Sequence, residues 1–407
     1  MNHRGAVVFF AQTEQYRTYI RLPMQQTFPD IENLIAFRQE LHQHPELSGL
    51  EEGTAKRIVK QLEQYKPDQI LTGLGGTGVA AVYNGMLPGG NTVMFRAELD
   101  ALPIQDINDM PYSSTLAGVS HKCGHDGHMA ILLGLAALLH REKPRTGRVI
   151  LLFQPAEETG QGAMAVLQDN RFCALQPDYV FALHNLPGYP AHQVVVRNGS
   201  FAAASTGMII ELNGRSSHAA EPENGLNPGQ AMAELILELN QLILRKKLFQ
   251  DLTLLTIIHA RLGEIAFGTN PGFATIMATL RSYQQADLDL LKTLASDAAA
   301  QVADKYGLGY SVRFVEEFPA TVNYKQAVEL VKQAAEKLKL DTLEAVHPFK
   351  WSEDFGHFTA KYKGALLGLG AGLEQAQLHH AHYDFPDTII PTGANLLYTL
   401  ATNILNP

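Results

Sequence analysis

The sequence has few cysteines, and this argues against one class of protein. Only 2 of its 407 residues are cysteine, which is too few for the disulfide framework that stabilises small secreted domains. In a chain of this length, a cysteine is more often a metal ligand, a nucleophile or buried filler in a reducing compartment. We therefore expect a cytoplasmic protein without structural disulfides.

Long apolar runs and blocks of like charge are also missing. No apolar run reaches the roughly 18–20 residues that a membrane-spanning helix needs, and AVVFFA at residues 6–11 is too short for a signal-peptide core. The net charge is −9, and the lysines and arginines do not gather in a basic stripe. This argues against nucleic-acid binding. We expect neither membrane nor nucleic acid as a partner, and interpret residues 1–27 as an N-terminal extension.

What is present is a series of short apolar strands with helical segments around and between them. Helical spacing predicts a helix capped by Asp30, a second over residues 51–65 and a third over 128–141. Strands that are apolar on both faces are typical of a sheet covered by helices on both sides. The pattern predicts an α/β sandwich with a mixed central sheet, whose strands are expected at 79–83, 92–97, 149–153, 179–184 and 365–370.

Residues from about 200 to 317 follow a different order. The pattern is strand, helix, strand, strand, helix, strand, which is the ferredoxin-like βαββαβ unit. The expected elements are 206–213, 226–246, 252–261, 273–283, 286–306 and 309–317. Because the strand at 365–370 belongs to the first pattern, we expect a discontinuous catalytic domain of residues 28–198 and 318–407, interrupted by an inserted domain of residues 199–317.

The segment GLGGTG at residues 73–78 matches the glycine fingerprint of dinucleotide-binding proteins. That fingerprint must follow a strand and open a helix. Here the glycines precede the strand at 79–83, and no helix comes before the next strand. We therefore expect a turn at this position and no nicotinamide cofactor.

Polar residues that can bind metals gather just past the ends of the predicted strands. In open α/β sheets, ligands bind at the edge formed by the carboxyl ends of the strands. The pattern therefore predicts a site at this edge. The residues concerned are Glu98, Asp100, Glu157, Glu158, His184, His379, His380 and His382.

The segment SHKCGHDGH places histidines around one of the two cysteines. Cys123 and His125 alternate, so in an extended stretch both side chains point the same way. Thiolate and imidazole are good ligands for zinc-like ions, and we expect both residues to bind metal. We expect His121 to be peripheral, and His128 to be a partly exposed histidine at the first turn of the next helix.

Glu157 and Glu158 are adjacent acids after a proline-containing turn, where their side chains can converge. Two ionised carboxylates side by side repel each other, so a cation should neutralise one of them. One acid would then bind metal while the other takes a proton from a water molecule held there. The alternative is a solvated acidic start of a helix, where carboxylates are also favoured.

Three other classes of protein are alternatives to a metal-dependent hydrolase. A zinc base deaminase needs a P-C-x-x-C segment, and neither cysteine lies in one. A cysteine hydrolase would use Cys123 as its nucleophile and would work in the presence of a chelator. A non-catalytic binding protein on the same fold would be expected to have lost at least one of these residues.

Six motifs, in order, resemble the N-acyl-amino-acid amidohydrolases. This is the hippurate-hydrolase and auxin-conjugate-hydrolase branch of the dinuclear metallopeptidases, and the resemblance covers roughly residues 30 to 400. It implies an α/β catalytic domain with an inserted ferredoxin-like lid that usually forms a homodimer. The motifs are RAELDALPI, KCGHDGHMAILLGLA, LFQPAEETGQGA, ALHNLPG, GRSSHAAEPENGLNP and LHHAHYDF.

The resemblance implies a site with two divalent ions, which would be manganese, zinc, cobalt or nickel. It makes Glu157 the general base, and its leucine–histidine motif favours His379 over His380 and His382. The implied metal ligands are Cys123 as the bridge, His125, Glu158, His184 and His379.

Four further residues match positions of the family outside the ligand set. Asp100 would orient a metal ligand. His218 would help to hold the oxyanion, often from the other subunit of a dimer. Asn270 and Arg281 would hold the carboxylate of the substrate.

The implied activity is hydrolysis of N-acyl amino acids, such as N-acetyl or N-benzoyl derivatives, to a carboxylic acid and a free amino acid. A dipeptidase or a metallo-carboxypeptidase on the same site is the alternative. The sequence departs from the branch at Glu98, where aspartate is common, and at Ser120 and Lys122 in SHKCGHD, where MHACGHD is usual. We expect Lys122 to place a positive charge near the bridging cysteine.

Overall fold

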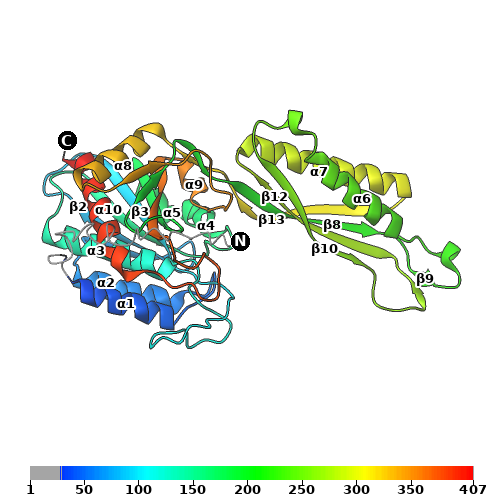
Figure 1. Cartoon of the computed structure of the whole chain (residues 1–407), viewed down its shortest axis with the longest axis horizontal. Coiled ribbons are helices and arrows are strands. Elements are labelled where there is room, and N and C mark those ends of the chain that lie inside the picture. The colour runs from blue at the N-terminus through cyan, green and yellow to red at the C-terminus, as the bar shows by residue number, and fades with distance from the viewer. Residues whose placement is uncertain (1–27, 29, 407) are drawn as a thin grey trace, which may run out of the picture.

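The structure is a computed structural model that describes Phe28 and residues 30–406, so the expected N-terminal extension lies outside the described residues. The chain builds one large and one smaller β-sheet, each with its own helices (Figure 1). The large sheet has eight strands in the order β1-β2-β4-β3-β5-β16-β6-β15. Parallel and antiparallel pairs occur in it, as expected for a mixed sheet.

Four central strands of the large sheet run in the same direction, because β3 pairs in parallel with β4 and β5, and β5 with β16. Their carboxyl ends therefore meet at one edge. Each predicted strand falls within an observed one. The strands are β1 (Gln69–Leu74), β2 (Gly78–Asn84), β3 (Thr92–Glu98), β4 (Arg148–Gln154), β5 (Tyr179–Pro187), β6 (Val194–Val196), β15 (Thr342–Glu344) and β16 (Lys363–Gly372).

Helices cover both faces of this sheet, as Figure 1 shows. Along β3, Val93 and Phe95 belong to one apolar core and Met94 to the other. This alternation explains why the strands are apolar throughout, and it confirms the α/β sandwich. One core includes α1 (Ile31–Gln43), α2 (Glu52–Gln64), α3 (His125–Arg141), α8 (Lys325–Lys337) and α10 (Ile390–Leu405), and the other includes α4 (Gly162–Gln168), α5 (Asn170–Cys173) and α9 (Gly356–Thr359).

The smaller sheet has four antiparallel strands in the order β10-β12-β8-β13 and packs with α6 and α7 around a separate apolar core. Its elements follow one another as strand, helix, strand, strand, helix, strand, in the predicted order. They are β8 (Ala204–Asn213), α6 (Gly229–Leu242), β10 (Thr253–Leu262), β12 (Phe273–Ser282), α7 (Gln285–Tyr306) and β13 (Gly309–Phe318).

Short elements complete the described chain. The strands β7 (Gly199–Ala202) and β14 (Thr321–Asn323) pair with each other where the chain leaves the large sheet and returns to it. The strands β9 (Ser217–His218) and β11 (Thr269–Asn270) pair at the end of the smaller unit that lies far from the large one (Figure 1). The remaining 3₁₀ turns are η2 (Pro222–Asn224), η3 (Lys246–Leu248) and η4 (Asp387–Ile389).

The predicted glycine turn at residues 73–78 is observed, whereas the predicted helix cap at Asp30 is not. Within GLGGTG, Gly75 and Gly76 lie at positive φ in the turn between the antiparallel strands β1 and β2, whereas Gly73 and Gly78 belong to these strands. The predicted turn is therefore confirmed, and no helix begins at these glycines. Helix α1 begins at Ile31 as expected, but the predicted cap is wrong. The Asp30 carboxylate accepts a hydrogen bond from the Tyr65 hydroxyl at 2.9 Å and none from a backbone N–H of the helix.

The sequence predicts neither a membrane-spanning helix nor a structural disulfide. No helix within residues 30–406 is long and apolar enough to cross a membrane. Cys123 and Cys173 are both free.

We predict that Gly127→Ala destabilises the first turns of α3. A Cβ atom at this position would lie 2.2 Å from the ring of Phe385, which is itself buried. Such overpacking typically lowers the free energy of unfolding by about 1–3 kcal/mol, measurable by chemical denaturation. Gly268→Ala is the control, because no atom lies within 4 Å of its Cβ position. Equal stability of the two variants would contradict this close packing.

Candidate active site

The predicted residues meet at the carboxyl edge of the large sheet. Asp100 follows β3, Glu157 and Glu158 follow β4, and His184 lies in the second half of β5. Cys123 precedes α3, whose first residue is His125, and His379 lies in the loop after β16. The common direction of the four central strands thus brings segments together that are far apart in the sequence.

Six side chains in this cluster offer nitrogen, oxygen or sulfur atoms to a shared space. The Sγ atom of Cys123 lies 3.6 Å from Nε2 of His184, and Nε2 of His125 lies 3.8 Å from Oε1 of Glu158. On the other side of Glu158, Oε2 lies 3.9 Å from Nε2 of His379. Three sets of atoms fall within 4.8 Å of one another, namely Cys123–His125–His184, Cys123–Glu158–His379 and His125–Glu157–Glu158.

The chemistry of these donors fits divalent metal ions. The separations of 3.8 Å and 3.9 Å at Glu158 are too long for hydrogen bonds, whereas the 3.6 Å contact of the Cys123 sulfur is within the range of a sulfur hydrogen bond. Such spacings also suit pairs of ligand atoms on a common ion at about 2.0–2.3 Å each. Nε2 of His125 and Oε1 of Glu158 are buried, and neither has a hydrogen-bond partner in the described chain. A buried polar atom without a partner is costly, and a bound cation would satisfy both atoms.

Hydrogen bonds behind the cluster fix the two buried histidine rings. Nδ1 of His125 donates to the backbone carbonyl of Asp100 at 2.8 Å, and Nδ1 of His184 donates to the carbonyl of Asn185 at 2.9 Å. These bonds leave Nε2 of both rings facing the cluster, as metal ligands require.

Asp100 supports the cluster from behind. Its Oδ2 accepts hydrogen bonds from the Ser48 hydroxyl at 2.7 Å and from the Glu158 backbone N–H at 2.9 Å, and its Oδ1 lies 3.5 Å from Nδ1 of His125. Asp100 thus contacts both the His125 ring and the Glu158 backbone, and its orienting role stays a prediction.

Burial and crowded carboxylates shift the protonation of the cluster. Burial, followed by the charge of Glu353, raises the pKa of Glu157 well above its ordinary value. Burial raises the pKa of Glu158 to about 7, although His125 opposes the shift. Burial, followed by the charge of Glu158, raises the pKa of the Cys123 thiol. Protons and metal ions compete for the same atoms here.

The pKa values of the two buried histidines of the cluster shift in opposite directions. Burial lowers the pKa of His184 to about 3 and keeps its ring neutral. Burial also acts to lower the pKa of His125, but the hydrogen bond to Asp100 and the charges of Glu98 and Glu158 outweigh it and raise this pKa to about 10.

A second acidic pair, in the segment SEDF, was missed from the sequence. Glu353 and Asp354 are buried, and oxygen atoms of both lie within 4.8 Å of a Glu157 oxygen. The guanidinium of Arg96 pairs with Glu353 at 3.0 Å and with Asp354 at 2.6 Å, and also contacts Glu98. Glu353 and Asp354 are adjacent acids, as Glu157 and Glu158 are, so the same sequence pattern could have identified them. No local pattern connected it to Arg96.

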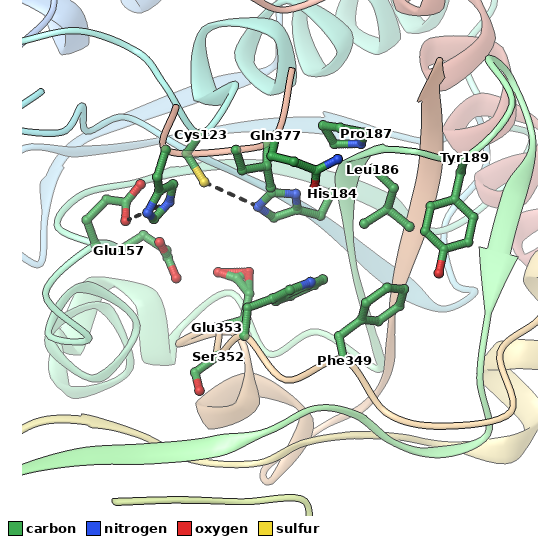
Figure 2. Close-up of a pocket in the computed structure, with 14 residues that line it drawn as sticks. Cys123, Glu157, His184, Leu186, Pro187, Tyr189, Phe349, Ser352, Glu353 and Gln377 are labelled. Carbon is green, nitrogen blue, oxygen red and sulfur yellow. Dashed lines mark hydrogen bonds and ion pairs between the residues drawn. The ribbon is translucent and has the colours of Figure 1, made fainter. Parts of the chain in front are cut away.

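The cluster opens into a pocket of about 460 Å³, a volume within the usual range for small-molecule sites. Figure 2 shows Cys123 and Glu157 at one end of the pocket, and Leu186, Tyr189 and Phe349 at the other. Aromatic residues of the segment before Glu353 therefore line the pocket, and no sequence pattern predicted them. Polar and ionisable residues thus gather at one end of the pocket, and apolar residues at the other.

The two other histidines of the SHKCGHDGH segment, His121 and His128, are both buried. His128 is buried, not partly exposed, because its Nδ1 donates to Glu98 at 2.7 Å and Asn185 packs against its other nitrogen. His121 is buried as well, but it belongs to none of the donor sets and does not line the pocket, as expected for a residue peripheral to the site. Burial lowers its pKa to about 4.

Lys122 also departs from expectation. Its Nζ is buried and donates to Asp106 at 2.7 Å and to the backbone carbonyl of Tyr383 at 2.9 Å. The Asp106 carboxylate therefore compensates its charge. Lys122 contacts the site through its backbone, because its carbonyl accepts a hydrogen bond from the His379 N–H at 2.7 Å.

Of the three candidate histidines near the C-terminus, only His379 lines the pocket. His380 and His382 stack on each other with ring centroids 5.6 Å apart and belong to none of the donor sets of the cluster. The geometry therefore favours His379, in agreement with the motif.

The three residues expected from the inserted unit are placed differently. His218 and Asn270 lie on the paired strands β9 and β11, at the far end of the smaller unit, and neither lines the pocket (Figure 1). Within one chain, the structure does not bring them to the cluster. Arg281 is close to the pocket, because its guanidinium donates to Ser352 Oγ at 2.7 Å and to the Lys350 carbonyl.

Comparison with known proteins agrees with this arrangement. Peptidase family M20/M25/M40 matches residues 94–403. N-acetyl-L-cysteine deacetylase of Bacillus subtilis is 32% identical over 374 residues, covering 92% of this chain and 88% of that protein. Hippurate hydrolase of Campylobacter jejuni is 31% identical over 373 residues, covering 90% and 95%.

A solved structure extends the likeness to the fold. A dinuclear metal-binding peptidase of the M20 family from Bacillus subtilis superposes with a TM-score of 0.78 at 26% identity, covering 92% of this chain and 98% of that one. The family model matches residues 94–403, which are most of the chain, and the likeness to this structure extends over most of the chain as well. The chain belongs to the M20/M25/M40 peptidase family and is a metal-dependent hydrolase of the amidohydrolase and peptidase type.

Proposed function

We propose that this enzyme hydrolyses the amide bond of N-acyl amino acids, releasing a carboxylic acid and a free amino acid. The observation that carries the proposal is the donor cluster around Glu158, with Glu157 beside it at the polar end of the pocket. The names of the two relatives, an N-acetyl-L-cysteine deacetylase and a hippurate hydrolase, support this class of substrate.

We propose that the cluster would hold two divalent ions and that Cys123 could contribute to the binding of both. This thiol belongs both to the donor set with His125 and His184 and to the set with Glu158 and His379. When bound, such ions polarise the amide carbonyl and lower the pKa of a water molecule. The same site would serve a dipeptide, whose scissile bond is also an amide.

Glu157 is the group that we propose moves the proton. Its carboxylate is buried, and Oε1 accepts a hydrogen bond from the Asp354 backbone N–H at 3.3 Å. The raised pKa of this carboxyl makes it a stronger base than an exposed glutamate. It takes the proton from the attacking water and then passes it to the nitrogen of the leaving amino acid.

We further propose that residues 199–317 form an inserted ferredoxin-like lid that mediates dimerisation. The strand order β10-β12-β8-β13 and the helices α6 and α7 support the ferredoxin-like assignment. Because His218 is exposed and lies far from the pocket of its own chain, it would reach the pocket of the partner subunit and stabilise the oxyanion there. Asn270, beside it, would help to hold the substrate carboxylate.

A panel of substrates tests the proposed activity. The protein loaded with manganese, zinc or cobalt is assayed against N-acetyl, N-benzoyl and longer N-acyl amino acids, with dipeptides in parallel. We expect turnover of N-acyl amino acids that stops in chelator. Faster turnover of dipeptides would favour the peptidase alternative, and activity that survives chelation would contradict the metal-dependent mechanism.

We predict that metal binding releases protons and strengthens as pH rises. The pKa of Cys123 is raised and that of Glu158 is about 7, so both groups hold protons near neutral pH that an ion must displace. Zinc titration calorimetry in two buffers of different ionisation enthalpy measures the release. Cys123→Ala should bind at least one ion fewer and release fewer protons. Two ions in that variant, or a heat independent of buffer, would contradict the ligand assignment.

We predict that Glu157→Gln retains its metal but loses catalysis. The amide cannot accept the proton from water, and loss of a general base lowers kcat by about 10²–10⁴-fold. Elemental analysis gives the metal content and steady-state kinetics give kcat. Glu336→Gln, at an exposed position on α8, is the matched control and should behave as wild type. Normal turnover by Glu157→Gln would remove this residue from the base role.

We predict that His218→Ala lowers kcat by about a hundredfold, the scale expected for loss of an oxyanion donor. If His218 acts across a two-fold dimer, coexpression with Glu157→Gln should restore about a quarter of wild-type activity, because half of the dimers are mixed and each has one intact site. No recovery would mean that His218 serves its own subunit. An unchanged kcat in the single variant would take it out of the site.

A further inference from the structure

The pocket has an apolar half that the hydrolytic chemistry does not use. The polar half holds the donor cluster, whereas the opposite half continues away from it (Figure 2). Apolar pocket walls contribute binding energy by removing a matching ligand surface from water. The residues of this apolar wall are Leu186, Pro187, Tyr189, Phe349, Trp351 and Leu378.

Two aromatic rings dominate the apolar wall. The rings of Phe349 and Trp351 stack with centroids 5.0 Å apart and planes 28° apart. Trp351 also lies against His184, with centroids 5.2 Å apart, so it connects the wall to the donor cluster. Both rings are only partly buried although they are large and apolar. A flat apolar group that enters the pocket can therefore cover surface that the chain itself leaves open.

The wall is held rigidly from behind. Phe201 is fully buried and packs against Phe349 and Trp351, with centroids 5.1 Å and 6.1 Å away. The backbone N–H of Ala203 lies within hydrogen-bond distance of the carbonyls of both residues, at 3.1 Å and 3.0 Å. A surface fixed in this way loses little conformational entropy when a ligand binds.

Charge narrows the choice of ligand. Among the 14 described residues that line the pocket, none is lysine or arginine, and three are glutamates. An acyl group with its own carboxylate would have no cation to pair with at the apolar end. An acetyl group would leave the aromatic surface largely uncovered. An uncharged, flat, apolar group fits both constraints.

The other end of the substrate has a different place. Ser352 lies on the side of the pocket away from Leu186 and Pro187 (Figure 2), and the Arg281 guanidinium reaches Ser352 from the smaller unit. The carboxylate of the amino acid would face this cation. The apolar wall is then left for the acyl group.

We infer that the substrates of this enzyme carry an aromatic acyl group that packs on Trp351 and Phe349, and that Trp351 is the residue that selects it over short acyl groups. The inference rests on the proposed function, since it names the acyl part of the same reaction. It places no new group at the scissile bond. Its effect is on binding of one end of the substrate.

Kinetics with one amino acid and two acyl groups test this inference. For the zinc-loaded enzyme, kcat/KM should be higher for N-benzoylalanine than for N-acetylalanine. Trp351→Ala should lower kcat/KM for the benzoyl substrate by about tenfold or more, mainly through KM, and by a clearly smaller factor for the acetyl substrate, as expected for loss of apolar pocket contacts. Trp351→Phe should retain most of the preference. Tyr310→Ala, which removes an exposed ring on β13, is the control.

A binding measurement separates this inference from the proposed function. Trp351 is the only tryptophan in the chain, so intrinsic tryptophan fluorescence reports this site alone. Benzoate should change the emission in a saturable manner, whereas acetate at the same concentrations should not. This result would support the aromatic wall even if no N-acyl amino acid were hydrolysed. Equal loss of both substrates in Trp351→Ala, or identical responses to benzoate and acetate, would overturn the inference.

Discussion

Charge compensation among buried acids is the constraint on which this active site depends. Arg96, at the carboxyl end of β3, is fully buried and contacts Glu98, Glu353 and Asp354. A buried ion pair contributes little net stability, but removing one partner leaves costly unpaired charge. The contacts of Arg96 with Glu353 and Asp354 therefore help to position the SEDF segment. They also help to position the aromatic residues that precede Glu353.

The same constraint divides the acids into two groups. Glu98, Glu353 and Asp354 contact a permanent cation of the chain, whereas Glu157 and Glu158 lie beyond its direct contacts, beside the thiol and the imidazoles. Permanent pairing makes the first group a fixed support. No lysine or arginine of the described residues pairs with the second group. This agrees with the roles that we propose, in which Glu158 exchanges a proton for a metal ion and Glu157 moves a proton. This difference explains how six acidic side chains, counting Asp100, fit into one edge of a sheet while only some of them take part in chemistry.

Much of the fold and the donor set could be predicted from the sequence because both rest on local patterns. The apolar strands and the motifs KCGHDGH and QPAEE are short segments whose chemistry is readable on its own. The predictions failed where a side chain's partner lies elsewhere in the chain. Asp30 pairs with Tyr65 and does not cap its helix. His128 is buried beside Glu98 and Asn185, and the Lys122 ammonium pairs with Asp106.

By itself, the sequence determined the order of strands and helices, a set of candidate donor residues and the expectation that they gather at the carboxyl edge of a sheet. These follow from periodicity and from the neighbours of each residue. The tertiary structure alone decided that Arg96 joins Glu353, 257 positions away, and that Trp351 and Phe349 form one wall of the pocket. Such contacts depend on the order of strands across the sheet and on the path of the loops between them, and no local pattern encodes either.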